Sequence, residues 1–146
     1  MATTTDTNRA LLHREIEQTF GRVPEWVKQL PDTALAGFWR VFSDFYLSDT
    51  LIPKKYKELI GIGVSAATHC RYCTLFHTES ARLQGASDQE IAEASMMAGV
   101  TMMGSTFING QQVDYGQFAK ETREIVTWVR QQMASTRPVR EHHARV

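Results

Sequence analysis

The chain has 146 residues, of which 42% are hydrophobic and 22% charged, values ordinary for a globular protein with one core. Its 16 basic and 16 acidic residues cancel, so the composition provides no cationic surface for nucleic acid or anionic lipid. The sequence contains no run of about 18 apolar residues, and its first residues lack the pattern of a signal peptide. We therefore expect a cytoplasmic protein that neither crosses a membrane nor binds nucleic acid.

Hydrophobic periodicity indicates helices nearly throughout the chain. The first helix is predicted over about residues 7–20 and ends at Gly21, a residue favoured just beyond a helix. A short element restarts at Pro24. Over residues 35–46, apolar and mostly aromatic side chains recur with a helical period. This segment is predicted to be a core helix.

Three further helices follow in the middle of the chain. One is predicted over about residues 54–67 and the next over about 69–84. Ser87 and Glu90 have the spacing of a capping box, in which the side chain of each residue accepts a hydrogen bond from the backbone N–H of the other. They open a helix that is expected to end near Gly104.

A short helix after Gly104 and a long helix over about residues 114–133 are expected to complete the fold. The ends, residues 1–6 and 136–146, are expected to be flexible. No convincing alternating pattern of a strand is present. The sequence therefore predicts a single all-α domain over residues 1–146, with six to seven helices and its core motif region at 54–100.

The two cysteines carry the clearest chemical signal. Cys70 and Cys73 are the only cysteines, and on a helix they would share one face with His77, at i, i+3 and i+7. In a reducing compartment a close pair favours catalysis or metal binding over a structural disulfide. Thiol catalysis needs a thiolate, which a helix N-terminus stabilises, and a base for its proton. His77, one turn after Cys73, is a candidate for that base.

Glu58 is the candidate for a group that orients His77. It lies on the preceding predicted helix, and a sharp turn near Thr68 would bring the two helices side by side. The alternative is an ordinary surface pair between Glu58 and Lys54, which are four residues apart. Arg71, beside the cysteines, is a candidate for additional positive charge.

Of three other interpretations of the cysteine pair, the sequence disfavours a zinc site and a thioredoxin-like module and leaves a redox sensor or scaffold as an alternative. A zinc site would use both cysteines and His77, with His69 or Glu58 as the fourth ligand, but the chain lacks the second ligand cluster usual in structural zinc sites. A thioredoxin-like module would place the pair after a strand, whereas here it follows a helical segment rich in Ala and Gly. A redox sensor or oligomeric scaffold would oxidise the pair without turnover.

The spacing of four residues resembles the signature of a known family. Glu58, Cys70, Cys73 and His77, separated by eleven, two and three residues, resemble the motif of the AhpD-like alkylhydroperoxidases within the carboxymuconolactone decarboxylase superfamily. Similarity over about residues 20–100 includes the flanking segments Phe20–Pro24 and Leu83–Ala94.

This resemblance implies an all-helical fold, assembly into trimers or hexamers, and a peroxidase cycle without a cofactor or metal. Glu58 and His77 would relay a proton away from the cysteines. Cys73 would attack the peroxide and become a sulfenic acid, and Cys70 would donate a proton and then form a disulfide with Cys73. An external dithiol, such as a lipoyl-bearing protein, would reduce the disulfide. Reduction of another disulfide substrate is the alternative, and decarboxylation is disfavoured because the decarboxylase branch lacks the cysteine pair.

Overall fold

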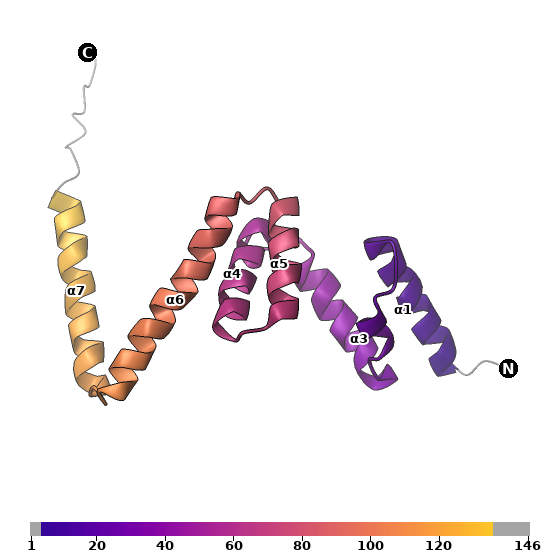
Figure 1. The fold of residues 1–146 in the computed structure, drawn as a ribbon, viewed down its shortest axis with the longest axis horizontal. Helices are drawn as coiled ribbons and strands as arrows, with labels where there is room; N and C mark the ends of the chain where they lie inside the picture. The colour runs from indigo at the N-terminus through magenta and orange to yellow at the C-terminus, as the bar shows by residue number, and fades with distance from the viewer. Residues whose placement is uncertain (1–3, 136–146) are drawn as a thin grey trace, which may run out of the picture. The chain divides into compact units, whose positions relative to one another are not determined.

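The computed structural model describes residues 4–135 of the chain. Over this range the chain forms seven α-helices and one π-helical segment, with no strand (Figure 1), which confirms the all-α prediction. The first helix begins at Thr4, so residues 4–6, which were expected to be flexible, are part of α1. The other residues predicted to be flexible, 1–3 and 136–146, lie outside the described range.

The elements follow one another in this order: α1 (Thr4–Phe20), α2 (Glu25–Lys28), α3 (Asp32–Arg40), η1 (Val41–Tyr46), α4 (Lys54–Ala67), α5 (Arg71–Leu83), α6 (Asp88–Gly110) and α7 (Tyr115–Ser135). Contacts divide the chain into two compact units, one up to Gly99 and the other from Val100 onward. The boundary therefore falls inside α6.

Two predicted elements differ from the observed ones. The single core helix expected over residues 35–46 is an α-helix that becomes π-helical at Val41, where the N–H of Leu47 donates to the carbonyl of Phe42 five residues earlier, at 2.9 Å. The break expected near Gly104 is absent, because α6 continues to Gly110. An internal glycine costs a helix only about 1 kcal/mol.

An aromatic core joins the N-terminal helices to the middle of the chain. Ile16, Val27, Leu35 and Trp39 are buried together between α1, α2 and α3. The rings of Phe20, Trp39 and Phe42 pack with centroids about 6 Å apart, and Phe42 in turn packs on Tyr46 at 4.8 Å. This chain of ring contacts fixes the end of η1, from which Tyr46 reaches the site described below.

Helices α4 and α5 form a hairpin and pack side by side (Figure 1). Their shared core contains Ile62, Ala81 and Ala86. The Ser87–Glu90 capping box is confirmed, since the Glu90 N–H donates to the Ser87 hydroxyl at 3.1 Å and the Ser87 N–H to the Glu90 carboxylate at 2.8 Å. The packing of α4 against α5 also confirms that a sharp turn near Thr68 brings these two helices together.

The turn between α4 and α5 is a Schellman motif. The N–H of Cys70 donates to the carbonyl of Ser65 at 3.0 Å, and that of His69 to the carbonyl of Ala66 at 3.3 Å. His69 adopts a left-handed backbone conformation, with φ of 55°, at the position where glycine is most common. The last carbonyls of α4 are thus satisfied by the residues that lead directly into α5.

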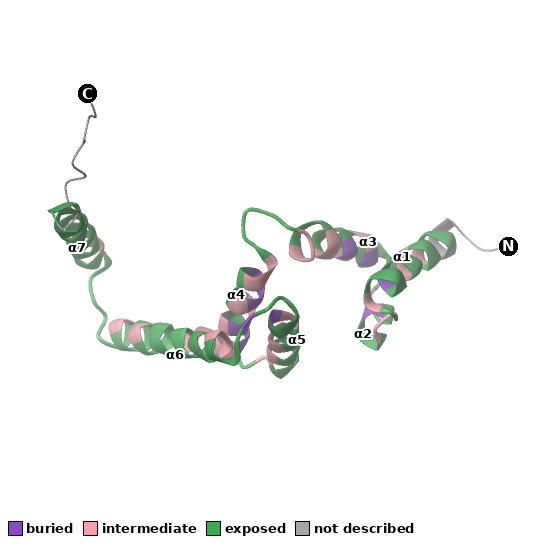
Figure 2. Cartoon of the chain, turned by 90° about the horizontal axis from the view of Figure 1, so that it is seen from above, coloured by how far each residue is buried: buried purple, intermediate pink, exposed green. Residues whose placement is uncertain are grey.

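Helices α6 and α7 carry no buried residue (Figure 2). Both are nonetheless rich in large apolar side chains that are exposed, among them Met96, Met103, Phe107, Trp128 and Val129. Helix α6 has 23 residues, and its most apolar stretch of 18 residues has a mean hydropathy of 1.2, so by length and composition it could cross a membrane. Core helices of globular proteins also have this length and composition, so the expectation that the chain does not cross a membrane stays a prediction.

Candidate thiol redox site

Cys70 occupies the position immediately before the first turn of α5. The sequence places this helix start at about residue 69, whereas the structure begins α5 at Arg71 and makes Cys70 its N-cap. The Cys70 sulfur accepts a hydrogen bond from the backbone N–H of Cys73, at 3.3 Å. Both cysteines are free thiols, with Cys70 partly exposed and Cys73 exposed. A sulfur in the cap position receives the partial positive charge of the helix N-terminus.

The two thiols differ in acidity. A hydrogen bond from the Cys73 thiol, together with that from the Cys73 N–H, lowers the pKa of Cys70 from its ordinary value. The same hydrogen bond between the thiols, followed by desolvation, raises the pKa of Cys73. Cys70 therefore loses the first proton of the pair. For Cys73 to act as a nucleophile, as the resemblance implies, it must pass its proton to a base during the reaction.

His77 and Glu58 are in direct contact. His77 Nδ1 lies 2.8 Å from the Glu58 carboxylate, whose side chain is only 7% exposed. The alternative surface pair of Glu58 with Lys54 is not formed, because Lys54 lies beside Asp49, at 3.6 Å. A carboxylate at Nδ1 orients the imidazole and leaves Nε2 as the nitrogen that is available for proton transfer.

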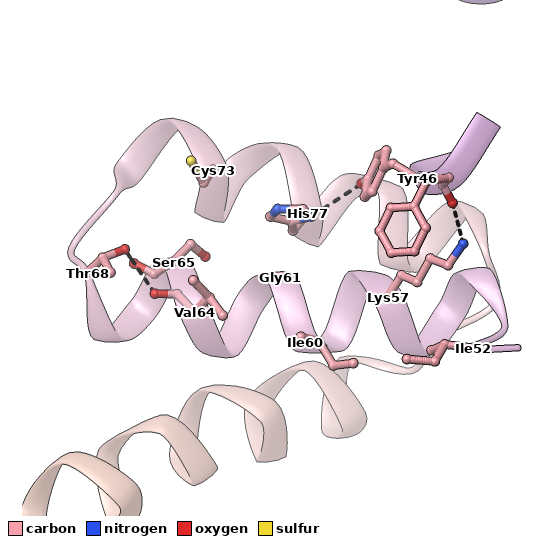
Figure 3. Close-up of a pocket in the computed structure, with 11 residues that line it drawn as sticks. Tyr46, Ile52, Lys57, Ile60, Gly61, Val64, Ser65, Thr68, Cys73 and His77 are labelled. Carbon is pink, nitrogen blue, oxygen red and sulfur yellow. Dashed lines mark hydrogen bonds between the residues drawn. The ribbon is translucent and has the colours of Figure 1, made fainter. Parts of the chain in front are cut away.

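Gly61 provides the surface on which the His77 ring lies (Figure 3). A Cβ atom at Gly61 would be 2.4 Å from Nδ1 and 2.5 Å from Cε1 of His77, well inside van der Waals contact. At Gly63, one half-turn along α4, a Cβ would meet only the carbonyl oxygen of Ala94, at 3.7 Å. Of these two glycines, Gly61 alone is required by the position of the histidine.

Cys73 and His77 line the same open pocket, between α4, α5 and η1 (Figure 3). The pocket has a volume of about 370 Å³. Most of its wall consists of apolar groups, including Phe45, Ile52, Ile60 and Val64. Cys70 and Glu58 do not line it. Of the four residues singled out in the sequence, Cys73 and His77 therefore line the pocket. The other two contact them from outside it: Cys70 contacts Cys73, and Glu58 contacts His77.

Two residues that the sequence analysis did not single out complete the site. The Tyr46 hydroxyl donates to both oxygens of the Glu58 carboxylate, at 2.6 and 2.5 Å. Lys57, which is 8% exposed, donates from Nζ to the carbonyls of Phe45 and Ser48, at 2.5 and 2.8 Å. In the sequence, the feature that indicates a role for Tyr46 is its place in the apolar stripe of residues 35–46. A tyrosine hydroxyl at such a position needs a polar partner.

Two other residues considered in the sequence have different surroundings. The Arg71 guanidinium donates to the Tyr72 hydroxyl at 2.9 Å and lies over the Tyr72 ring, so its charge is directed there. His69 contributes its left-handed backbone to the turn. Within residues 4–135, no three Cys, His, Asp or Glu side chains gather in a way that could hold a metal ion, so the described site does not offer the ligand set of a zinc ion.

The middle of the chain matches a known protein family. Residues 33–109, more than half of the chain, match the model of the carboxymuconolactone decarboxylase family. The chain is 26% identical over 95 residues to a protein of Paracoccus denitrificans named uncharacterized protein 4 in cox locus, covering 62% of this chain and 86% of that protein.

Two solved structures resemble the chain. The crystal structure of the alkylhydroperoxidase AhpD core of Rhodospirillum rubrum matches with a TM-score of 0.64 and 22% identity, over 72% of this chain and 80% of that one. A protein of Methanobacterium thermoautotrophicum matches with a TM-score of 0.52 and 27% identity, over 61% of this chain and 98% of that one. The chain therefore belongs to the carboxymuconolactone decarboxylase family and has the AhpD-like all-α fold.

Proposed function

We propose that this protein is a thiol-dependent peroxidase that reduces alkyl hydroperoxides. The observation that carries the proposal is the placement of Cys73 and His77 in one apolar pocket, with His77 held by a buried carboxylate and a second thiol beside the first. Apolar walls suit the organic part of an alkyl hydroperoxide. A histidine oriented by a carboxylate is the arrangement that removes a proton from a nucleophile in many enzymes.

The proposed cycle balances with the residues of the site and one external reductant. His77 takes the proton of Cys73, and the Cys73 sulfur attacks one peroxide oxygen, so that an S–O bond forms and the O–O bond breaks. The alkoxide leaves and takes a proton from Cys70, giving an alcohol and a sulfenic acid on Cys73. The Cys70 sulfur then forms the disulfide, and the hydroxyl leaves as water with the proton held by His77. An external dithiol, for which a lipoyl-bearing protein is our candidate, is oxidised as it reduces the disulfide.

The lowered pKa of Cys70 supports its part in this cycle and also favours a second candidate function. A thiol of lowered pKa gives up its proton readily and is then present as the thiolate that closes the disulfide. The same thiolate can attack a substrate disulfide directly, forming a mixed disulfide that Cys73 resolves. Reduction of disulfides led by Cys70 is therefore the alternative.

The test is hydroperoxide consumption with dihydrolipoamide as reductant, comparing the parent with Cys73→Ser and Glu58→Gln. We expect turnover by the parent, none by Cys73→Ser, and a rate lower by about 10²-fold or more in Glu58→Gln, the scale of general base catalysis. Consumption of hydroperoxide by Cys73→Ser at the parent rate would exclude Cys73 as the nucleophile. Slow stoichiometric oxidation without turnover would instead indicate a redox sensor.

Trapping experiments separate the two candidate functions. With hydroperoxide, Cys70→Ser lacks the thiol that forms the disulfide, so the peroxidase predicts a sulfenic acid on Cys73 that dimedone labels. With a linear disulfide such as glutathione disulfide, attack by Cys70 releases one glutathione thiol, and Cys73→Ser lacks the resolving thiol, so the disulfide reductase predicts a stable mixed disulfide on Cys70. Mass spectrometry distinguishes the two adducts.

We also propose that the protein is a homo-oligomer. The supporting observation is the set of large apolar side chains exposed along α6 and α7, which exceeds what isolated surface residues explain. A second copy of the chain, in a trimer or hexamer, would cover them. The mass of the parent by light scattering, compared with that of variants charged on α6, tests this proposal.

A further inference from the structure

We infer that Tyr46 is a positioning residue that fixes which nitrogen of His77 carries the proton. The hydroxyl acts through Glu58 and not on the substrate. The effect on the imidazole follows from hydrogen-bond geometry alone. Only its consequence for the rate rests on the proposed function.

The hydroxyl of Tyr46 has one proton, and the geometry assigns it to Glu58. The oxygen lies 2.6 and 2.5 Å from the two carboxylate oxygens of Glu58 but 3.3 Å from Nδ1 of His77. Having donated its proton to Glu58, the Tyr46 oxygen can only accept from Nδ1. The Glu58 carboxylate, 2.8 Å from Nδ1, also only accepts.

Both polar neighbours of Nδ1 are therefore acceptors, so Nδ1 must be the protonated nitrogen. In a neutral imidazole the other nitrogen, Nε2, is then left with its lone pair. Without the Tyr46 hydroxyl, the carboxylate loses one of its two donors and is less firmly held. A carboxylate that turns away from Nδ1 no longer holds the proton there, so His77 can carry its proton on Nε2, and this nitrogen then cannot accept one from Cys73.

The Tyr46 hydroxyl is held in place by contacts to the Tyr46 ring and to the backbone on either side of this residue. The Tyr46 ring packs on Phe42 at 4.8 Å and on Phe76 at 6.1 Å. Lys57 binds the carbonyls of Phe45 and Ser48 on either side of Tyr46. Lys57 thus holds the backbone around Tyr46, and the next residue of α4, Glu58, holds the Tyr46 hydroxyl.

The charges around the hydroxyl keep it a donor. Burial, and then the hydrogen bond to Glu58, raise the pKa of Tyr46 well above its ordinary value. The Lys57 side chain also lines the pocket. It donates to backbone carbonyls and not to Glu58, so Tyr46 and His77 are the donors to the Glu58 carboxylate. Tyr46 therefore remains protonated over the pH range in which the thiols react.

The test compares the ring nitrogens of His77 in the parent, in Tyr46→Phe and in Tyr56→Phe, by long-range ¹H–¹⁵N spectra of the reduced protein. Phenylalanine keeps the ring contacts of Tyr46 and removes only the hydroxyl. Tyr56 is 54% exposed on the same helix as Glu58 and is the matched control. The signals of His77 are assigned by their loss in His77→Gln.

We expect the parent and Tyr56→Phe to carry the proton on Nδ1, and Tyr46→Phe to show a measurable share of the Nε2–H form. Its rate of Cys73 oxidation by hydroperoxide should fall about tenfold, part of what a general base contributes. Unchanged His77 signals in Tyr46→Phe would overturn the inference, as would the same change in Tyr56→Phe. The spectra need no turnover. They therefore test the role of Tyr46 separately from the peroxidase proposal, which can fail while the His77 signals still change in Tyr46→Phe.

Discussion

The imidazole of His77 rests on the backbone of α4 at a point where only the hydrogen of Gly61 fits. Gly61→Ala is therefore expected to displace the ring, break its contact with Glu58, and lower the rate of hydroperoxide reduction by about 10²-fold, as loss of an oriented base does. The measurement is the reaction rate alongside the His77 ring signals.

Gly63→Ala is the matched control, since its Cβ has room and the change favours the helix by roughly 1 kcal/mol. This variant should react at the parent rate and melt at the same or a higher temperature. A Gly61→Ala variant that reacts like the parent would show that the position of the ring does not matter.

The reactivity of Cys70 depends on donors supplied by Cys73. At neutral pH, iodoacetamide is expected to modify Cys70 before Cys73, because the pKa of Cys70 is lowered and that of Cys73 raised. Cys73→Ala removes the thiol donor, which stabilises the Cys70 thiolate, so the pKa of Cys70 should rise and its alkylation profile move to higher pH. Mass spectrometry of the alkylated peptides follows the profile.

Cys73→Ser serves as the comparison because its hydroxyl can still donate, and its profile should move less. An alkylation profile of Cys70 that is unchanged in Cys73→Ala would mean that the backbone N–H alone sets the acidity of this thiol.

At the scale of the elements, Lys57 connects α4 to η1. Lys57→Met leaves the carbonyls of Phe45 and Ser48 without this donor, and a buried polar group without a partner costs roughly 1–3 kcal/mol. We expect a loss of that size in the free energy of unfolding, measured by urea denaturation.

Lys55→Met provides the control from the same helix. Lys55 forms a partly exposed ion pair with Glu90, at 2.6 Å, and ion pairs near the surface contribute about 0–1 kcal/mol. Equal losses in the two variants would contradict the anchoring role of Lys57.

The helices themselves were largely predictable from the sequence, and their irregularities were not. The predicted limits of 54–67 coincide with α4, because Pro53 marks its start and the apolar pattern continues to Ala67. The π-helical turn of η1 has the same aromatic stripe as an ordinary helix, and it is held by Lys57 from a later element. Contacts of this kind depend on tertiary packing, which no local pattern encodes.

The site was predicted to a similar extent. The spacing of the cysteines and histidine placed them on one helix, and the resemblance selected Glu58, which the structure places against His77. Local spacing did not reveal that Cys70 caps α5 and does not lie within it. It also did not reveal that Tyr46 shares the carboxylate, because that contact joins segments twelve residues apart through a turn.

At the scale of the whole molecule, the exposed apolar side chains of α6 and α7 are the basis of the proposed assembly. We expect the parent to have the mass of a trimer or hexamer by light scattering. Phe107, 67% exposed on α6, would be buried between copies, so Phe107→Asp should lower the mass, since an unpaired carboxylate is costly to bury.

Thr106→Asp adds the same charge at the neighbouring exposed position and is the control. Its mass should equal that of the parent. A monomeric parent, or equal dissociation of both variants, would contradict the assignment of these faces to subunit contacts.

The corner between α4 and α5 restricts how this sequence can vary. The N–H of Cys70 closes the last turn of α4, and its sulfur caps the first turn of α5. An inserted or deleted residue between Thr68 and Arg71 would therefore move the thiol out of one of these positions. The eleven-residue interval between Glu58 and Cys70 should consequently tolerate substitution but not a change of length, and a glycine at residue 69 would suit the left-handed backbone there at least as well as histidine.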